Sequence, residues 1–206
     1  MIRGYLFTFE GIDGCGKSTQ ITLLSDALTN EGIPVSIQRE PGGTPIAEAI
    51  REVLLNPENS KMTNESEALL MAASRVQLLK EVVIPEIESG KVVLCDRYVD
   101  SSLAYQGAGR GLPMEWVREI NHLAFESAVP DRTFFLDLPV EAALERLGSR
   151  RRDRIESSGT DFLKRVREGF SALAEDEPDR YIVLDAMLRP ELLAEEILSH
   201  TKRLIQ

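Results

Sequence analysis

Apolar residues along this chain alternate between short continuous runs and runs with helical spacing. The strand-like segments cover residues 5–9, 35–38, 92–96, 133–138 and 181–186, and the continuous apolar run at 92–96 is typical of a strand buried on both faces of a parallel sheet. Between them, apolar residues recur every three or four positions, which predicts helices over residues 17–31, 45–56, 64–88 (bent near Pro85), 99–106, 114–127, 140–147, 160–175 and 190–204. This alternation predicts an α/β fold in which a five-stranded parallel sheet carries helices on both faces. We expect one domain over residues 1–206 and a site at the carboxyl ends of the strands.

The net charge and the apolar content limit the kinds of partner that this chain can bind. The formal net charge of -10 argues against a nucleic-acid polymer, whose binding needs excess Lys and Arg, but it leaves room for a small anion in a local basic pocket. No stretch approaches the roughly eighteen apolar residues of a membrane span, so we expect no membrane partner and a cytoplasmic location. Cys15 and Cys95 are too few for a disulfide scaffold and are expected to be small buried residues.

The segment "GIDGCGKS", residues 11–18, matches the phosphate-binding pattern G-x-x-x-x-G-K-[ST]. It follows a predicted strand and precedes a predicted helix, as the pattern requires. The glycines allow a tight turn that aims backbone N–H groups at phosphates, and the helix N-terminus adds partial positive charge. Lys17 would reach the outer phosphates and the Ser18 hydroxyl would ligate Mg²⁺. The expected ATP-binding residues here are Gly11, Ile12, Asp13, Gly14, Cys15, Gly16, Lys17, Ser18 and Thr19.

A second motif, "LCDRY" at residues 94–98, ends the third predicted strand. Asp96 can hold the metal, directly or through water, and Arg97 would lie over bound phosphates, which suit its planar fork. These motifs indicate nucleotide binding and leave two function classes open, a kinase and a nucleotide-driven switch. A GTPase switch would usually carry N-K-x-D and D-x-x-G motifs downstream of the phosphate loop, and neither occurs here. A kinase needs a second anion site and an arginine-rich lid, and the sequence offers candidates for both.

Five ordered segments carry a resemblance to a known family: "FEGIDGCGKST" (9–19), "REPGGTP" (39–45), "ALLMAASRVQLL" (68–79), "DRYVDSSLAYQGAGRG" (96–111) and "DRIESSGTDFLKRVREGF" (153–170). With them the chain resembles bacterial-type thymidylate kinases, which belong to the nucleoside monophosphate kinases of the P-loop NTPase fold. The resemblance implies transfer of the γ-phosphoryl group of ATP to dTMP, giving dTDP and ADP in dTTP synthesis. It also implies Mg²⁺ and a homodimer.

The resemblance further implies an acceptor site. The site would comprise Asp13, Glu40, Arg51, Met71, Arg75, Arg97, Ser102, Tyr105 and Gln106. In the family, the loop acid serves the sugar hydroxyl, the two arginines at 51 and 97 hold the acceptor phosphate, and Arg75 bonds a base oxygen. Tyr105 would crowd the sugar 2′ position, and Met71 stands where the family usually has Phe. From the residues alone, Arg51 fits a solvated helix position, Met71 a core residue and Tyr105 a half-buried structural aromatic.

The run "GSRRRDRIESSG", residues 148–159, concentrates arginine in an acidic chain. Such a run is usually a solvated surface, but by resemblance it occupies the place of the catalytic lid. Some family members carry an arginine in the phosphate loop where this chain has Gly14, so the lid would supply the missing charge. The expected catalytic residues are Lys17, Arg97, Arg151, Arg152 and Arg154, with Arg150 at the ATP. Another nucleoside monophosphate or deoxynucleoside kinase, and a non-catalytic ATP-binding switch, remain as alternatives.

Overall fold

The computed structural model describes residues 3–148 and 153–205. Its sheet has five parallel strands in the order β2-β3-β1-β4-β5. The strands are β1 (Tyr5–Glu10), β2 (Val35–Arg39), β3 (Val92–Asp96), β4 (Arg132–Asp137) and β5 (Tyr181–Asp185). The predicted α/β class and parallel sheet are confirmed, and every predicted strand is found to within one residue at each end.

The predicted helices are also found, with three differences in detail. Their bounds are α1 (Lys17–Asn30), α2 (Pro45–Leu55), η1 (Pro57–Asn59), α3 (Asn64–Leu78), η2 (Leu79–Val83), α4 (Ile84–Glu88), α5 (Val99–Ser102), η3 (Leu103–Gly109), α6 (Met114–Ile120), α7 (His122–Ser127), α8 (Val140–Leu147), η4 (Glu156–Ser158), α9 (Thr160–Asp176) and α10 (Pro190–Ile205). The span 64–88 contains a π-helix, η2, which ends two residues before Pro85, and the missing N–H of this proline prevents the regular helical bond there. The span from residue 99 continues as a second π-helix to Gly109, and the span 114–127 is divided at Asn121.

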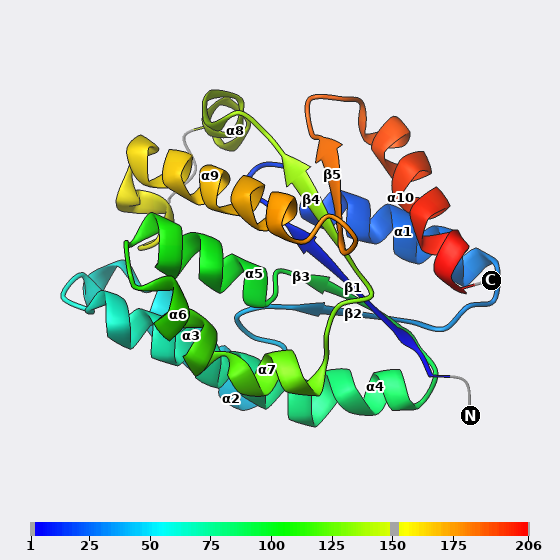
Figure 1. The fold of residues 1–206 in the computed structure, drawn as a ribbon, viewed down its shortest axis with the longest axis horizontal. Helices are drawn as coiled ribbons and strands as arrows, with labels where there is room; N and C mark the ends of the chain where they lie inside the picture. The colour runs from blue at the N-terminus through cyan, green and yellow to red at the C-terminus, as the bar shows by residue number, and fades with distance from the viewer. Residues whose placement is uncertain (1–2, 149–152, 206) are drawn as a thin grey trace.

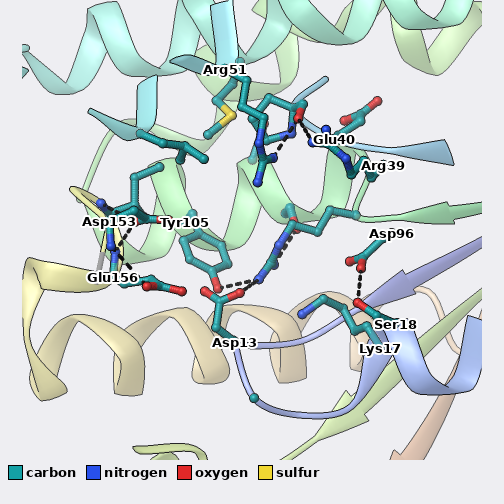
Figure 2. Close-up of a pocket in the computed structure, with 18 of the residues that line it drawn as sticks. Asp13, Lys17, Ser18, Arg39, Glu40, Arg51, Asp96, Tyr105, Asp153 and Glu156 are labelled. Atoms are coloured by element: carbon teal, nitrogen blue, oxygen red, sulfur yellow. Dashed lines mark hydrogen bonds and ion pairs between the residues drawn. The ribbon is translucent and has the colours of Figure 1, made fainter. Parts of the chain in front are cut away.

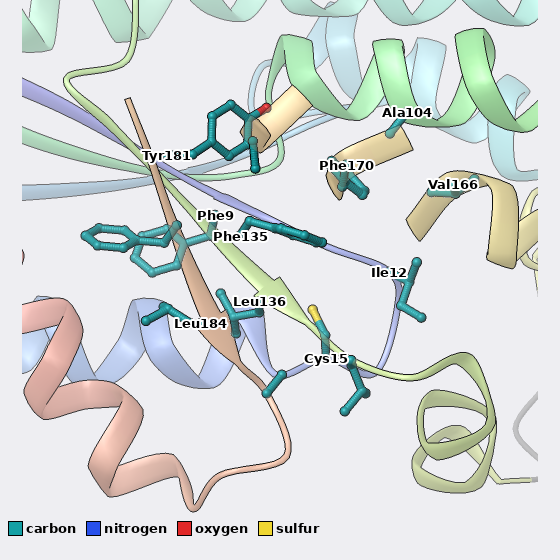
Figure 3. Packing of buried hydrophobic residues seen from close by; sticks show 14 of the residues in the cluster. Phe9, Ile12, Cys15, Ala104, Phe135, Leu136, Val166, Phe170, Tyr181 and Leu184 are labelled. Carbon is teal, nitrogen blue, oxygen red and sulfur yellow. The ribbon is translucent and has the colours of Figure 1, made fainter. Parts of the chain in front are cut away.

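Helices cover both faces of the sheet (Figure 1). Helices α1 and α10 pack together on one face, and α3, η2 and α4 cover the other. Alternate residues of β1 serve the two faces, as the two-residue period of a strand requires. Phe7 and Phe9 join one cluster with Leu24 and Leu28 of α1, and Leu6 joins a second cluster with Leu78 and Val83 (Figure 3 shows Phe9). The central strand β1 is therefore buried on both sides, which explains its continuous apolar run.

The strand register brings the functional segments to one edge of the sheet. Asp96 at the end of β3 is opposite Phe9 of β1 and Arg39 of β2. The phosphate loop after β1, the Asp96–Arg97 pair after β3 and Glu40 after β2 consequently leave the sheet side by side. Among the residues that the structure describes, no helix combines the length and apolar character needed to cross a membrane.

Candidate functional site

A cavity of about 480 Å³ opens at the carboxyl edge of the sheet (Figure 2). Basic and acidic side chains from distant segments face one another across it. Its lining includes most of the predicted site residues: Asp13, Gly14, Gly16, Lys17, Ser18, Thr19, Glu40, Arg51, Met71, Arg75, Asp96, Arg97, Ser102, Tyr105 and Gln106. The fold thus assembles the two predicted sites, donor and acceptor, into one cavity.

The phosphate loop forms one wall. Lys17 is buried, and its Nζ donates to the carbonyl oxygens of Gly11 at 3.1 Å and Ile12 at 3.3 Å, so the ammonium is held inside the loop. Gly11 has a φ of 135°, and a Cβ there would lie 2.6 Å from the Leu136 carbonyl oxygen, so the position requires glycine. The side chains of Ile12 and Cys15 belong to the core (Figure 3). Of the predicted ATP-binding set, these residues can offer only backbone groups.

Both cysteines are buried free thiols, as expected from the sequence. Burial raises the pKa of the Cys15 thiol, although Lys17 opposes the rise. Burial also raises the pKa of Cys95 well above its usual value, and the Glu40 carboxylate adds to this effect. Both side chains therefore act as small core residues, and neither is an activated thiolate.

Ser18 and Asp96 meet at the mouth of the phosphate loop. The Ser18 Oγ donates to Asp96 Oδ2 at 2.9 Å. A hydroxyl and a carboxylate oxygen are ligands that Mg²⁺ prefers. The described part of the chain contains no group of three His, Cys, Asp or Glu side chains that could hold a metal by themselves. This donor set fits an ion that takes its remaining ligands from phosphates and water, as Mg²⁺ usually does.

Arg97 lies between the phosphate loop and the side chains of Ser101 and Tyr105. Its Nη1 donates to the Gly11 carbonyl at 3.0 Å and to Ser101 Oγ at 3.1 Å, and its Nη2 donates to Asp13 Oδ1 at 2.8 Å and Tyr105 OH at 3.1 Å. Its backbone has a φ of 72°, which is strained for a residue with a side chain. Burial disfavours its charge, but Tyr105 and Asp13 raise the pKa of Arg97 well above its usual range. The surrounding contacts hold the strained backbone of Arg97 in place. The raised pKa means that its side chain stays positively charged.

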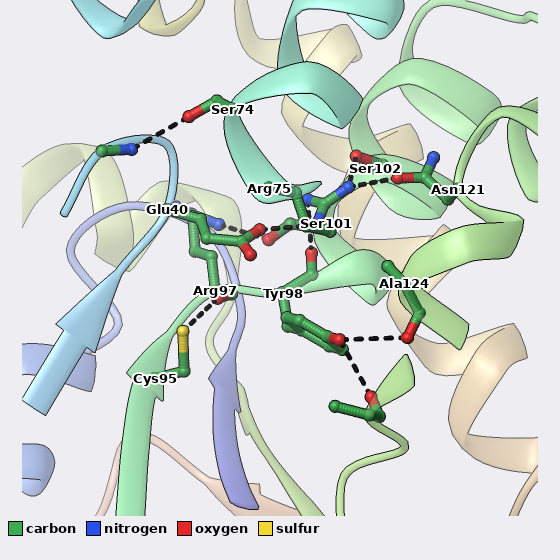
Figure 4. Close-up of polar contacts among 12 residues, drawn as sticks. Glu40, Ser74, Arg75, Cys95, Arg97, Tyr98, Ser101, Ser102, Asn121 and Ala124 are labelled. Atoms are coloured by element: carbon green, nitrogen blue, oxygen red, sulfur yellow. Dashed lines mark hydrogen bonds and ion pairs between the residues drawn. The ribbon is translucent and has the colours of Figure 1, made fainter. Parts of the chain in front are cut away.

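Arg75 anchors the opposite wall (Figure 4). It is 2% exposed, and its Nε donates to Glu40 Oε2 at 2.6 Å. Nη1 donates to Ser102 Oγ at 2.9 Å and to Asn121 Oδ1, and Nη2 donates to the Tyr98 carbonyl at 3.0 Å. Burial raises the pKa of Glu40 to about 7, with Arg75 opposing the rise. Arg75 therefore connects the loop that carries Glu40 to the segments that carry Tyr98, Ser102 and Asn121. The sequence did not predict this structural role.

Three arginines that line the cavity, Arg39, Arg51 and Arg97, lie close enough for their charges to interact. Arg51 is half-buried and its Nη1 donates to the Pro41 carbonyl at 2.8 Å, so it is not the solvated residue that its helix position alone suggested. Burial lowers the pKa of Arg51, and the positive charges of Arg39 and Arg97 lower it further, while Glu48 opposes them. Mutual repulsion of this kind is relieved when an anion binds. This part of the cavity is suited to a phosphate group.

Eight lining residues were not predicted from the sequence, and four of them are charged: Arg39, Arg146, Asp153 and Glu156. Arg146, in the last turn of α8, donates from Nη1 to the Gly14 carbonyl at 3.4 Å and from Nη2 to the Ala186 carbonyl at 2.8 Å. Arg146 therefore places a positive charge beside Gly14 of the phosphate loop. Asp153 and Glu156 belong to the segment "DRIE", in which the sequence predicted a role for Arg154 alone. Their spacing of three residues, which places two carboxylates on one side of a helical turn, was the available signal.

The arginine run divides at the limit of the described residues. Arg150, Arg151 and Arg152 lie outside them, so their expected roles stay predictions. Arg154 is described: its Nη2 lies 2.7 Å from Glu67 Oε2 in an ion pair, and its Nε donates to the Leu54 carbonyl at 2.8 Å. The cavity is lined by its neighbours Asp153, Ile155 and Glu156 instead. In this structure Arg154 is an anchoring residue at the cavity rim.

Glu10 is fully buried beneath Arg97. Its Oε1 accepts a bond from the Tyr98 N–H at 2.7 Å, and its Oε2 accepts one from Ser101 Oγ at 2.6 Å. Burial, reinforced by the Asp100 carboxylate, raises the pKa of Glu10 from 4.5 to about 8, although Ser101 and Arg97 oppose the rise. Glu10 therefore holds the turn that carries Arg97 while keeping a proton near neutral pH.

This raised pKa predicts a pH-dependent stability. Between pH 5 and 8 the folded state binds the Glu10 proton more tightly than the unfolded chain, so the free energy of unfolding falls as pH rises through this range, by at most about 1.4 kcal/mol per pH unit and proton. We expect Glu10→Gln to flatten this slope in urea unfolding at pH 5.5, 7 and 8.5, leaving the part due to Glu40. The exposed control Glu119→Gln should keep the original slope. An unchanged slope in Glu10→Gln would contradict the assignment.

Comparison with known proteins identifies the family of this chain. The sequence model of the family described as thymidylate kinase matches residues 9–197. The thymidylate kinase of Desulforudis audaxviator is 48% identical over 206 residues, which cover 100% of this chain and 93% of that protein. Those of Pelotomaculum thermopropionicum (45% over 206 residues, 99% and 95% covered) and Chlorobaculum parvum (47% over 204 residues, 94% and 94% covered) are similar over comparable lengths. The chain therefore belongs to the thymidylate kinase family, the nucleotide-biosynthesis transferases that use ATP to phosphorylate dTMP to dTDP.

Proposed function

We propose that this chain acts as a single kinase domain. It would bind ATP and dTMP together in the cavity of Figure 2, transfer the γ-phosphoryl group to dTMP, and release dTDP and ADP. The observation that carries the proposal is the meeting, in one cavity, of a phosphate loop with Lys17 and a second basic wall with Arg51 and Arg97. A nucleotide-binding switch needs only the first of these. Two anion sites that face one another are what transfer between two phosphates requires.

On the donor side, Lys17 and the backbone N–H groups of the loop would hold the ATP phosphates. Ser18 and Asp96 would hold Mg²⁺, which would neutralise charge on the phosphate oxygens when bound. Arg97 is anchored between the loop and Asp13, which places its positive charge between the donor and acceptor sides of the cavity. Arg146 supplies a further cation beside Gly14. The predicted contributions of Arg150 to ATP binding and of Arg151 and Arg152 to transfer add to this set.

On the acceptor side, Arg51 and Arg97 would bind the dTMP phosphate. Met71 and Tyr105 would contact the base and sugar, Asp13 the sugar hydroxyl, and Ser102 and Gln106 the base edge. Among the described residues, Arg75 uses four of its five N–H groups, which supports a base contact through the fifth. Glu40 would act through Arg75, whose orientation it fixes.

We also propose a cytoplasmic homodimer. The family resemblance supports the dimer, and so do the exposed apolar side chains of Ile46, Val53 and Leu69 on the adjacent helices α2 and α3. A monomer in sedimentation equilibrium, at micromolar concentration, would count against it. The formal net charge of -10 supports a small-molecule partner instead of a nucleic-acid polymer. The helices of the described residues include none that is long and apolar enough to cross a membrane.

Acceptor-dependent ADP release tests the function. The purified chain is mixed with ATP and Mg²⁺, and ADP is measured without acceptor and with dTMP, dUMP, dCMP, UMP or AMP. We expect strong stimulation by dTMP, weaker stimulation by the others, and loss of turnover when EDTA removes the metal. A preference for another monophosphate would identify a different kinase of this fold. ATP binding with no stimulation by any acceptor would favour the switch.

A further inference from the structure

The segment Asp153–Ser158 is a folded turn, and we name it the anchor turn. The Asp153 Oδ1 accepts bonds from the N–H groups of Ile155 at 2.9 Å and Glu156 at 2.8 Å. Backbone bonds from Ser157 to the Asp153 carbonyl and from Ser158 to the Ile155 carbonyl close the turn. Ile155 is 7% exposed and belongs to the main core cluster. These contacts fix the internal shape of the turn.

Arg154 attaches this turn to helices α2 and α3. Its backbone N–H donates to the Leu55 carbonyl at 3.2 Å, and its Nε donates to the Leu54 carbonyl at 2.8 Å. Both carbonyls belong to the last turn of α2, where no helical N–H is left to bond them. The guanidinium also forms the ion pair with Glu67 of α3, in which the two side chains are 11% and 1% exposed. Arg154 is therefore engaged through both its backbone and its side chain.

Glu67 connects the same turn to the acceptor wall. Its Oε1 accepts bonds from Gln106 Nε2 at 3.0 Å and Arg110 Nε at 3.1 Å, and its Oε2 accepts one from Arg110 Nη2 at 3.0 Å. Arg110 also donates to Ser158 Oγ at 2.8 Å. Burial alone would raise the pKa of Glu67, but bonds from Arg110 and Gln106 together lower it, so Glu67 stays a carboxylate.

The anchor turn presents two carboxylates to the cavity. Asp153 and Glu156 lie on the side of Tyr105 and Asp13, across the cavity from Ser18 and Asp96 (Figure 2). The Asp153 charge also acts on Arg51, whose charged form it favours. The turn thus completes the acceptor half of the cavity, and its position depends on the Arg154–Glu67 pair.

We infer that Arg154 is a positioning residue for acceptor binding: its ion pair with Glu67 and its bonds to the end of α2 hold Asp153 and Glu156 in the acceptor half of the cavity. This role replaces direct contact between Arg154 and the transferred phosphoryl group, which its place in the arginine run suggested. The inference rests on the proposed function for the location of the acceptor.

Calorimetric binding of dTMP without ATP, combined with steady-state kinetics, separates the two roles. For Arg154→Ala we expect the Kd and KM of dTMP to rise about tenfold, the loss typical of a hydrogen bond to a charged group, with kcat and the KM of ATP changing less than about threefold. Glu67 keeps Arg110 and Gln106 as partners, so the variant leaves no unpaired buried charge. Arg154→Lys, which retains a cation beside Glu67, should recover most of the dTMP affinity.

Two comparisons show whether the pair acts as a unit. The effects of Arg154→Ala and Glu67→Gln on dTMP affinity should be less than additive in the double variant, because both remove the same contact. Arg165 of α9 is a matched control, since it also bonds a carbonyl, that of Gly109, through Nε and Nη2. Arg165→Ala should leave dTMP affinity within about twofold of the unchanged protein.

Three results would contradict the inference. A fall in kcat of about 10³-fold with unchanged dTMP affinity is the loss expected of an arginine on the transferred group, and it would overturn the inference. Unchanged kcat and unchanged affinity in Arg154→Ala would overturn it as well. If the unchanged protein neither binds dTMP nor turns it over, the proposed function and this inference fail together.

Discussion

Replacing Lys17 with Met is expected to lower kcat by about 10²- to 10³-fold. An ammonium held at the phosphates stabilises charge that develops during transfer, and loss of one such preorganised group typically costs about 3–4 kcal/mol of transition-state stabilisation. The Lys17 Nζ is already fixed inside the loop by the Gly11 and Ile12 carbonyls, so the substrate gains this cation at little entropic cost. Coupled measurement of ADP release at saturating ATP and dTMP checks the prediction.

A surface lysine provides the matched control. Lys80 is exposed and its Nζ donates to Ser127 Oγ, remote from the cavity lining. Lys80→Met should therefore retain kcat within about twofold, as surface substitutions usually do. Circular dichroism should show that both variants keep the fold. A kcat for Lys17→Met close to that of Lys80→Met would show that the loop lysine does not stabilise the transfer.

Replacing Arg97 with Ala is expected to lower kcat/KM for dTMP by about 10³-fold or more. The substitution removes a cation that would serve the acceptor phosphate and the transferring group, and it removes the ion pair between Arg97 and Asp13. Arg97→Lys should recover little of the activity, because one ammonium cannot reproduce contacts with Gly11, Ser101, Asp13 and Tyr105 made by a planar fork. Steady-state kinetics with varied dTMP measures both variants.

Arg118 is the control for this position, since it is exposed on α6. Arg118→Ala should keep kcat/KM within about twofold. Full recovery of activity in Arg97→Lys would mean that only the charge matters and that the fork geometry has no role. A loss confined to the KM of ATP would assign Arg97 to the donor alone.

Local sequence patterns were enough wherever the chemistry depends on consecutive residues. The phosphate loop, Lys17 and Ser18 follow from one motif between a strand and a helix. Asp96 follows from the end of a continuous apolar run, and the observed bond between Ser18 and Asp96 joins the two motifs. The position of β3 was predictable because a strand buried on both faces is apolar at almost every position, whereas β2 is only partly buried.

Contacts between distant segments were not predictable in this way. Arg146 donates to the Gly14 carbonyl because α8 lies beside the phosphate loop. Glu67 of α3 pairs with Arg154 because the anchor turn lies against the end of α2 and against α3. An arginine run shows where positive charge is concentrated, but the direction of each side chain depends on the backbone around it. Arg154 for this reason has a role that neither its charge nor its neighbours in the sequence indicated.

The sequence by itself determined the α/β class, the strand and helix positions and the phosphate-binding end of the sheet, because these depend on the periodicity of apolar residues and on short motifs. Only the tertiary structure decided which charged groups face one another: Arg75 with Glu40, Arg97 with Asp13, and Arg154 with Glu67. The physical reason is that an ion pair forms only when its two charged groups lie within about 4 Å of one another in space. That distance is set by how the sheet order 2-3-1-4-5 brings remote segments together.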